Sequence, residues 1–307
     1  MTDDRQEPRL SVGVISAGAV GTAVAEVLRD AGHLIHGVVA RSAASRARAA
    51  ERLPGIPVVP VAEAAQAALV VLAVPDPQLP QVAAEVAEIT RPGQIVAHTA
   101  GSVGCAVLQP VTDTGALPLA LHPAMTFTGH ASDTAHLLGC AWGVTADSDT
   151  GAAVADILVD SVGGVPVHVP EEGRTLYHAA MAHGANHVVT LVSEAQRMLD
   201  HALAAGGTAP APVAAESAVL LRRIVPAAVG NALDDRMGAL TGPTARDDAA
   251  TVLRHLAALD ALAAAPGEQL ATAYREDAER TARAAGSIDV ERAVRPDYPD
   301  HPADDQR

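Results

Sequence analysis

Histidine is the main candidate for moving protons in this sequence, because all 21 basic residues are arginine and lysine is absent. His122 ends an apolar run and precedes Pro123, which is typical of a strand end. His183, Asn186 and His187 recur at helical spacing, so they share one helix face. We interpret the histidines as proton donors and Asn186 as a ligand for a substrate carbonyl or carboxylate. Loop anchoring of His122 and a solvent-facing polar helix are the alternatives.

A glycine-rich turn near the N-terminus has a different chemistry. Ser16, Gly18 and Gly21 follow an apolar run and open a helical stretch, in the order Ser-x-Gly-x-x-Gly. This is the place and spacing of a dinucleotide-binding turn, with serine replacing the first glycine. Serine fits there if the turn does not require positive φ. The turn and the following helix N-terminus predict a pyrophosphate site formed by Ser16, Ala17, Gly18, Ala19, Val20 and Gly21.

The end of the next apolar run indicates which dinucleotide binds. Sites for NAD usually place a carboxylate there, whereas sites for NADP place arginine and small hydroxyl groups. Here Arg41 and Ser42 follow the run, with Ser45 and Arg46 close behind. We predict NADP(H) as the cofactor, bound through Arg41 and Ser42. A solvated loop arginine is the alternative.

Three later strand ends are expected to meet above the cofactor. Prolines break the chain at Val74-Pro75-Asp76, and further apolar runs end at Thr99 and at His122. The carboxyl ends of parallel strands lie at one edge of a sheet, where such sheets bind ligands. We therefore predict that Val74, Pro75, Asp76 and Thr99 contact the cofactor.

Substrate contacts are expected from the second half of the chain. Arg174 is a candidate for binding a substrate carboxylate, with an ion pair to a nearby acid as the alternative. His178 lies near the expected domain junction, where packing of the hinge is the alternative. Thr241 and Gly242 open a helical stretch whose N-terminus is a candidate anion site. The aspartates that follow cap that helix in the alternative interpretation. His183 and His187 have metal-ligand spacing, but no third ligand accompanies them, so we predict no metal site.

The elements that position these residues divide the chain near residue 170. Short apolar runs alternate with helical stretches up to that point, which predicts a Rossmann-type parallel sheet within an NADP-binding α/β domain, residues 1–170. An all-helical domain for substrate binding and dimerisation is expected over 171–290, and a disordered Pro- and Asp-rich tail over 291–307. The expected strands are 10–15, 34–40, 57–59, 68–74, 94–98, 117–122, 140–145 and 165–169. The expected helices of the second domain are 171–205, 213–238, 243–262 and 267–285, with a loop at 206–212.

Composition limits the classes of function. The chain has 307 residues, two cysteines and a net charge of −15. This length favours two domains, and so few cysteines favour a reducing compartment, so we expect a cytoplasmic protein. Neither a signal peptide nor a membrane span is expected, and the negative charge makes nucleic acid an unlikely partner class on electrostatic grounds. The absence of lysine excludes a lysine acid, base or Schiff base.

Several of these segments together resemble the Rossmann-like DUF2520 family. The resemblance is carried by the Ser16 turn, the Val74-Pro75-Asp76 strand end, the segment 122–127, the segment 177–180, and Leu240-Thr241-Gly242-Pro243 with Arg246-Asp247. This family is similar to pyrroline-5-carboxylate reductase and, more distantly, to the ketopantoate, β-hydroxyacid and 6-phosphogluconate dehydrogenases. The resemblance implies a homodimer whose helical domain helps to form the substrate site. In the hydroxyacid dehydrogenases a lysine stands four residues before the asparagine that Asn186 resembles, and this chain has Ala182 there.

The resemblance and the residues favour an NADPH-dependent oxidoreductase that transfers hydride to a small imine or keto acid bearing a carboxylate. An imine depends less on a protein acid than a ketone does, so the missing lysine slightly favours an imine. Two alternatives stay open: a non-catalytic NADP(H)-binding sensor or scaffold, and an NADP/deazaflavin oxidoreductase. The large helical domain argues against the deazaflavin alternative.

Overall fold

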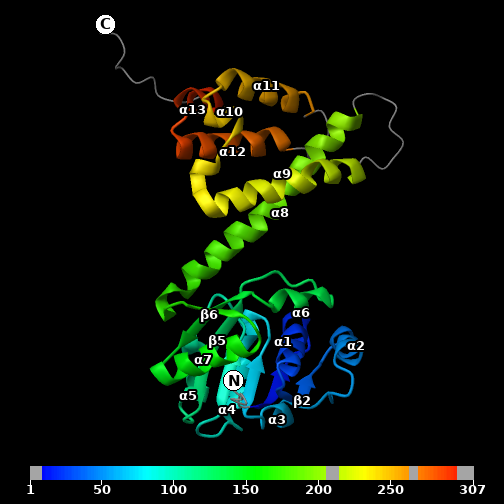
Figure 1. Cartoon of the computed structure of the whole chain (residues 1–307), viewed down its shortest axis with the longest axis vertical. Helices are drawn as coiled ribbons and strands as arrows, with labels where there is room; N and C mark the ends of the chain where they lie inside the picture. The colour runs from blue at the N-terminus through cyan, green and yellow to red at the C-terminus, as the bar shows by residue number, and fades with distance from the viewer. Residues whose placement is uncertain (1–8, 205–213, 263–268, 296–307) are drawn as a thin grey trace, which may run out of the picture. The chain divides into compact units, whose positions relative to one another are not determined.

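Seven apolar segments pair into one sheet, in the order β2-β1-β3-β4-β5-β6-β7 (Figure 1). The computed structural model describes residues 9–204, 214–262 and 269–295. The chain divides into two units, 1–185 and 186–307, and the boundary falls inside a long helix. The whole sheet belongs to the first unit, which therefore has the expected Rossmann-type architecture.

The sheet is parallel except at one pairing. Strands β1 to β5 run parallel to their neighbours, whereas β6 is antiparallel to β5 and parallel to β7. The predicted parallel sheet is confirmed apart from the β5–β6 pairing, which is antiparallel because the β5–β6 connection holds only the short helix α6 (Ser132–Leu137), packed against α1, and no crossover helix. The strands are β1 (Ser11–Ile15), β2 (Leu34–Val39), β3 (Leu69–Leu72), β4 (Ile95–His98), β5 (Leu117–Pro123), β6 (Ala141–Ala146) and β7 (Val165–His168).

Seven of the eight predicted strands are present, and the exception is instructive. The segment 57–59 forms a single bridge, between Val38 and Val58. Pro57 and Pro60 flank this bridge, and proline has no amide to donate to a sheet. An apolar run with prolines at both ends therefore makes one bridge and not a strand.

Two separate cores lie on the two faces of the sheet. Alternate residues of β3 show this, because Leu69 and Val71 join one core while Val70 and Leu72 join the other. Burial on both faces explains why β3 is apolar throughout. Helices α1 (Ala19–Asp30), α2 (Ala43–Arg52) and α7 (Asp149–Ser161) cover the first face, and α3 (Val61–Ala64), α4 (Leu79–Ala87) and α5 (Gln109–Thr112) cover the second.

The described part of the second unit is helical. A small core of α11, α12 and α13 includes Val252, Ala282 and Val294. The predicted helix 243–262 is divided in two, because Asp247 takes a φ of 53° between α10 and α11. The helices of the second unit are the end of α8 (Arg174–Ala204), α9 (Ala214–Asp235), α10 (Gly242–Ala245), α11 (Ala249–Asp260), α12 (Leu270–Ala285) and α13 (Ile288–Val294).

Helix α13 corrects one boundary. Val290 and Val294 are buried, so residues 291–294, which we expect in a disordered tail, belong to a packed helix. The remainder of that tail, from 296, and the predicted loop 206–212 lie outside the described residues.

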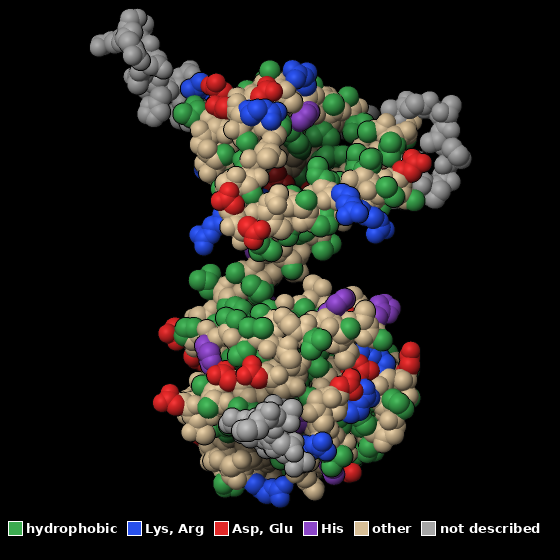
Figure 2. Space-filling view, viewed as in Figure 1, with side chains coloured by type: hydrophobic (Ala, Val, Ile, Leu, Met, Phe, Trp, Pro, Cys, Tyr) green, Lys and Arg blue, Asp and Glu red, His purple; other side chains and the backbone are tan. Residues whose placement is uncertain are grey.

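Helices α8 and α9 expose apolar side chains. Val189 in α8 and Leu220, Ile224 and Leu233 in α9 are all more than half exposed, with Leu233 at 82%. Apolar side chains gather on the visible face of the second unit in Figure 2. Among the described helices none is both long enough and apolar enough to cross a membrane.

Candidate active site

A pocket of about 320 Å³ opens at the carboxyl ends of β1, β2 and β3. The glycine-rich turn forms one wall, the start of α2 forms another, and Val74 and Gln78 line the side beyond β3. This edge is where an open α/β sheet binds its ligand. The predicted dinucleotide turn therefore borders a cavity of the first unit.

Ser16 takes a backbone conformation that favours glycine. Its φ is 92°, so the turn does require positive φ and the condition under which serine fits without strain is not met. The Ala17 amide donates to the Val39 carbonyl at 2.8 Å and fixes the turn to β2. A Cβ at Gly21 would lie 1.9 Å from the Ser16 carbonyl oxygen, so close packing of α1 requires glycine there. Gly18 is the N-cap of α1, and the first-turn amides of Ala19 and Val20 follow it.

Arginine and serine side chains line the opposite side of the pocket. Arg41, Ser42, Ser45 and Arg48 all contribute, and no acidic residue is among the described residues that line it. Arg46 instead donates to the Arg41 carbonyl at 2.6 Å and does not line the pocket. Our sequence analysis missed Arg48, although its spacing of three residues from Ser45 in a helix places the two on one face.

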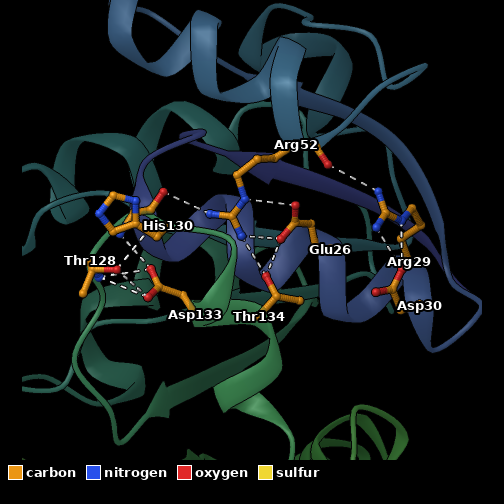
Figure 3. Close-up of polar contacts among 9 residues, drawn as sticks. Glu26, Arg29, Asp30, Arg52, Thr128, His130, Asp133 and Thr134 are labelled. Atoms are coloured by element: carbon orange, nitrogen blue, oxygen red, sulfur yellow. Dashed lines mark hydrogen bonds and ion pairs between the residues drawn. The ribbon is translucent and has the colours of Figure 1, made fainter.

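A buried ion pair holds the helices beside the pocket together (Figure 3). Arg52 of α2 donates to both carboxylate oxygens of Glu26 in α1, and the two side chains are only 6% and 10% exposed. The same guanidinium donates to Thr134 of α6 at 2.8 Å and to the Gly129 carbonyl at 3.2 Å. A Cβ at Gly129 would lie 3.4 Å from Arg48. The network therefore fixes the position of α2, the helix from which Arg48 enters the pocket. It also fixes the loop before α6, which lies beside Arg48.

The loops after β3 and β4 meet, as predicted. The Asp76 carboxylate accepts a hydrogen bond from the Ser102 hydroxyl. Val74 lines the pocket, and Pro75 turns the chain into the short helix η1 (Asp76–Gln78). Thr99 instead lines an apolar cavity between the sheet and helices α1 and α7. Of the strand-end residues predicted to contact the cofactor, Val74 is therefore in the pocket wall and Thr99 is not.

His122, Tyr177 and His178 form a cluster against the loop after β4. The Nδ1 atom of His122 lies 2.8 Å from the Tyr177 hydroxyl, and the two rings meet edge to face. The His178 ring also meets His122 edge to face, with 6.1 Å between centroids. A Cβ at Gly101 would lie 2.9 Å from His122 Nε2 and 2.7 Å from the His178 ring. A Cβ at Gly143 would lie 2.6 Å from the Tyr177 hydroxyl, so two glycines leave room for this cluster.

Arg174 lies beneath the cluster and is 1% exposed. Its guanidinium donates to the Thr145 hydroxyl at 2.7 Å and to the Ala120 and Gly143 carbonyls at 2.9 Å each. Its third nitrogen, Nη1, has no hydrogen-bond partner within the described residues. The guanidinium carbon is 5.7 Å from the centre of the Tyr177 ring. Arg174 is thus buried against the sheet, and binding of a substrate carboxylate by this residue stays a prediction.

Burial and nearby cations keep the histidines of this region neutral. Desolvation, and then the charges of Arg174 and His178, lower the pKa of His122 from 6.5 to about 4, although Asp76 opposes the shift. His98 is fully buried, and desolvation is the main reason that its pKa also falls to about 4. The imidazole rings of His98 and His122 are therefore both uncharged near pH 7. Burial raises the pKa of Tyr177, while Arg174 opposes that rise.

The remaining predicted site residues lie on helices with exposed surfaces. His183 belongs to the first unit, and Asn186 and His187 belong to the second; all three are exposed. Arg174 is the sole buried residue of α8 within the described residues. The roles of His183, Asn186 and His187 stay predictions. No group of three metal-ligating side chains occurs in the described part of the chain.

Thr241 is the N-cap of α10, a single four-residue turn whose first residue is Gly242. The aspartates after it serve as caps: Asp248 accepts from the Thr251 amide at 3.0 Å at the start of α11. Asp247 accepts from the backbone amide of Val290 at 2.8 Å at the start of α13. Asp248 therefore caps α11, within the predicted helix, whereas Asp247 binds the start of α13 and does not cap that predicted helix. Substrate binding by Thr241 and Gly242 stays a prediction.

Comparisons with known proteins agree with this architecture. Residues 1–123 match the Rossmann-like domain family, and residues 140–281 match the family described as a domain of unknown function, DUF2520. The chain thus carries a Rossmann-like domain followed by a DUF2520 domain, as its motifs predict. No curated protein sequence matches it significantly.

Solved structures share the fold at low sequence identity. A proposed NADP oxidoreductase from Bacteroides fragilis is 19% identical, with a TM-score of 0.70 over 90% of this chain and 98% of that one. A reductive aminase from Aspergillus terreus, in complex with NADPH and ethyl levulinate, is 16% identical, with a TM-score of 0.62 over 93% and 100%. A pyrroline-5-carboxylate reductase from Coxiella burnetii is 17% identical, with a TM-score of 0.54 over 94% and 97%.

Proposed function

We propose that the protein is an NADP(H)-dependent oxidoreductase that transfers hydride to a small imine or keto acid bearing a carboxylate. The pocket at the ends of β1, β2 and β3 carries this proposal, because Arg41, Arg48, Ser42 and Ser45 line it without an acidic residue. Guanidinium and hydroxyl groups bind a 2′-phosphate, which a carboxylate would repel. Two structural neighbours support the reaction class, since one is a reductive aminase solved with NADPH and another is a pyrroline-5-carboxylate reductase.

The cofactor is tested by calorimetric titration of the protein with NADPH and NADH. Loss of a charge-assisted hydrogen bond costs about 1.5–3 kcal/mol, so Arg41→Ala and Arg48→Ala should each weaken NADPH binding by about 10- to 150-fold. Binding of NADH should change little, because it lacks the 2′-phosphate. Arg29→Ala is the matched control, since Arg29 lies in the last turn of α1 and pairs with Asp30. Equal losses for both nucleotides, or no binding of either, would contradict the proposal.

The substrate class is tested with 1-pyrroline-5-carboxylate and ketopantoate, following NADPH oxidation. His122 is the proposed proton donor to a keto acid, because its Nε2 faces Gly101 on the loop after β4. An imine can be protonated before hydride arrives and therefore needs this donor less. Tight NADPH binding without oxidation by any imine or keto acid would instead favour a sensor or scaffold.

We also propose a homodimer formed by the second unit. The exposed apolar residues of α8 and α9, such as Val189, Ile224 and Leu233, form surface that a partner helix would bury. Leu233→Asp should lower the solution mass measured by analytical ultracentrifugation. A wild-type mass equal to one chain at every concentration would refute the dimer.

A further inference from the structure

We infer that Tyr177 and His122 form a proton relay, in which the phenol supplies the proton that the imidazole passes to the substrate. This inference rests on the proposed function, because it names the proton path of that reaction. The observation that suggests it is the geometry of His122: one ring nitrogen, Nδ1, lies 2.8 Å from the Tyr177 hydroxyl, and the other, Nε2, faces Gly101.

Glycine at position 101 lets the loop after β4 pack closely against Nε2 of His122. Any larger residue would place its Cβ 2.9 Å from Nε2 and 2.7 Å from the His178 ring. The loop that carries Gly101 is tied to the β3 end through the Ser102–Asp76 hydrogen bond, and Val74 at that end lines the dinucleotide pocket. Nε2 therefore lies against a loop that is tied to the same strand ends as the pocket.

The charges around the pair favour a tyrosine acid over an imidazolium acid. Groups from each neighbouring element act on His122: Arg174 and His178 from α8 and His98 from β4 disfavour its protonation, and only Asp76 favours it. A neutral imidazole gives up a proton at Nε2 when it gains one at Nδ1. Burial raises the pKa of Tyr177, and the Arg174 guanidinium, 5.7 Å from the centre of its ring, opposes that rise and so lowers the cost of the phenolate that remains when Tyr177 supplies this proton.

The relay balances in atoms and charge. With a keto acid, a bound NADPH would supply the hydride for the carbonyl carbon, and the carbonyl electron pair would move to its oxygen. That oxygen takes the proton from Nε2 of His122, and Nδ1 takes the phenolic proton of Tyr177. The phenolate beside Arg174 then regains a proton from water, and the cofactor leaves as NADP⁺. Tyr177 acts through His122 in this scheme and does not itself touch the substrate.

The relay requires one tautomer of His122, and nuclear magnetic resonance tests it without any substrate. Long-range ¹H–¹⁵N spectra, assigned by comparison with His122→Gln, should show a neutral ring protonated at Nε2 near pH 7. A ring protonated at Nδ1, or a charged ring at pH 7, would overturn the relay even if NADPH binds. Because NADPH binding is measured separately by calorimetry, failure of the relay and failure of the proposed cofactor site are distinguishable.

Kinetics then measure what the phenol contributes. Tyr177→Phe removes only the hydroxyl and should lower kcat for ketopantoate by about 100-fold, the lower range for general acid catalysis, with little change in KM or in NADPH binding. The loss with 1-pyrroline-5-carboxylate should be smaller, because that substrate can arrive protonated. A solvent isotope effect should accompany ketopantoate reduction and change in the variant. A kcat within threefold of wild type would overturn the relay.

The chain offers a matched control in its second unit. His255 Nδ1 lies 2.7 Å from the Tyr274 hydroxyl, and these rings also meet edge to face. Tyr274→Phe therefore removes the same kind of bond and should leave kcat unchanged. The double variant Tyr177→Phe/His122→Gln should be no slower than His122→Gln alone, because the two groups act as one unit. If the double variant instead lost kcat by the product of the two single-variant losses, Tyr177 and His122 would act separately, and the relay would be contradicted.

Discussion

Replacing Ser16 by glycine should stabilise the first unit. A non-glycine residue with positive φ costs about 1–2 kcal/mol, and Ser16 has a φ of 92°. Glycine removes this strain but increases the entropy of the unfolded chain, which offsets about 0.4–1 kcal/mol. The net expectation for Ser16→Gly is a gain of about 1 kcal/mol in the free energy of unfolding.

The chain contains a natural reporter for this measurement. Trp142 is the single tryptophan, lies in β6 of the first unit and is 4% exposed. Its fluorescence should follow unfolding of the sheet in urea. With a slope of about 2 kcal/mol per molar urea, Ser16→Gly should raise the midpoint by about 0.5 M without changing the slope.

Ser42→Gly is the control for this experiment. Ser42 has a φ of −86°, and its hydroxyl accepts from the Ser45 amide at 3.0 Å as the N-cap of α2. Glycine relieves no strain there and loses the cap, so stability should fall by a few tenths of a kcal/mol, about what glycine costs at an N-cap. A midpoint for Ser16→Gly at or below that of wild type would refute the strain reasoning.

Three further predictions follow from buried charge and titration. His98 and His122 have pKa values near 4 when folded, below their ordinary 6.5, so the unfolded chain binds more protons than the folded chain below about pH 7.5; urea midpoints should fall as pH drops from about 7.5 towards 4, most steeply below 6.5, and should level off above about pH 7.5. Burial, with the nearby carboxylate of Glu171, raises the pKa of Cys105 to about 12, so Ellman's reagent should label the other cysteine and spare this one until the protein is unfolded. Glu26→Gln leaves a buried guanidinium unpaired and should cost about 3–5 kcal/mol in urea unfolding, whereas Asp30→Asn, at an exposed pair on the same helix, should cost less than about 1 kcal/mol.

The sheet was predictable because its signal is local. A strand buried on both faces is a continuous apolar run, and seven of eight such runs became strands. The direction of β6 was not predictable in this way, because an apolar run such as Ala141–Ala146 does not indicate whether the strand pairs parallel or antiparallel to its neighbour. The direction of β6 depends on whether the connection between β5 and β6 crosses the sheet. The path of that connection depends in turn on how α6 packs against α1.

The site was harder to predict because its contacts join distant positions. The turn at Ser16 and the pair Arg41-Ser42 have short-range signals, and both lie in the pocket wall. His122 and Tyr177 are 55 positions apart, and no sequence spacing joins them. Their pairing needs the end of β5 and the start of α8 to meet, which only the fold determines.

Arg174 shows how one residue can mislead a sequence argument and still point to function. An arginine at a helix start usually faces water, but this one is buried with Nη1 unpaired within the described residues, which costs stability. The other guanidinium nitrogens of Arg174 donate hydrogen bonds to two carbonyls and one hydroxyl of the sheet. Those hydrogen bonds alone do not require a positive charge at this position. The positive charge does have an effect on the two side chains above it, because it opposes an imidazolium at His122 and favours a phenolate at Tyr177. A buried cation that biases both groups in the directions a proton relay needs gives a physical reason for keeping a residue that folding alone would disfavour.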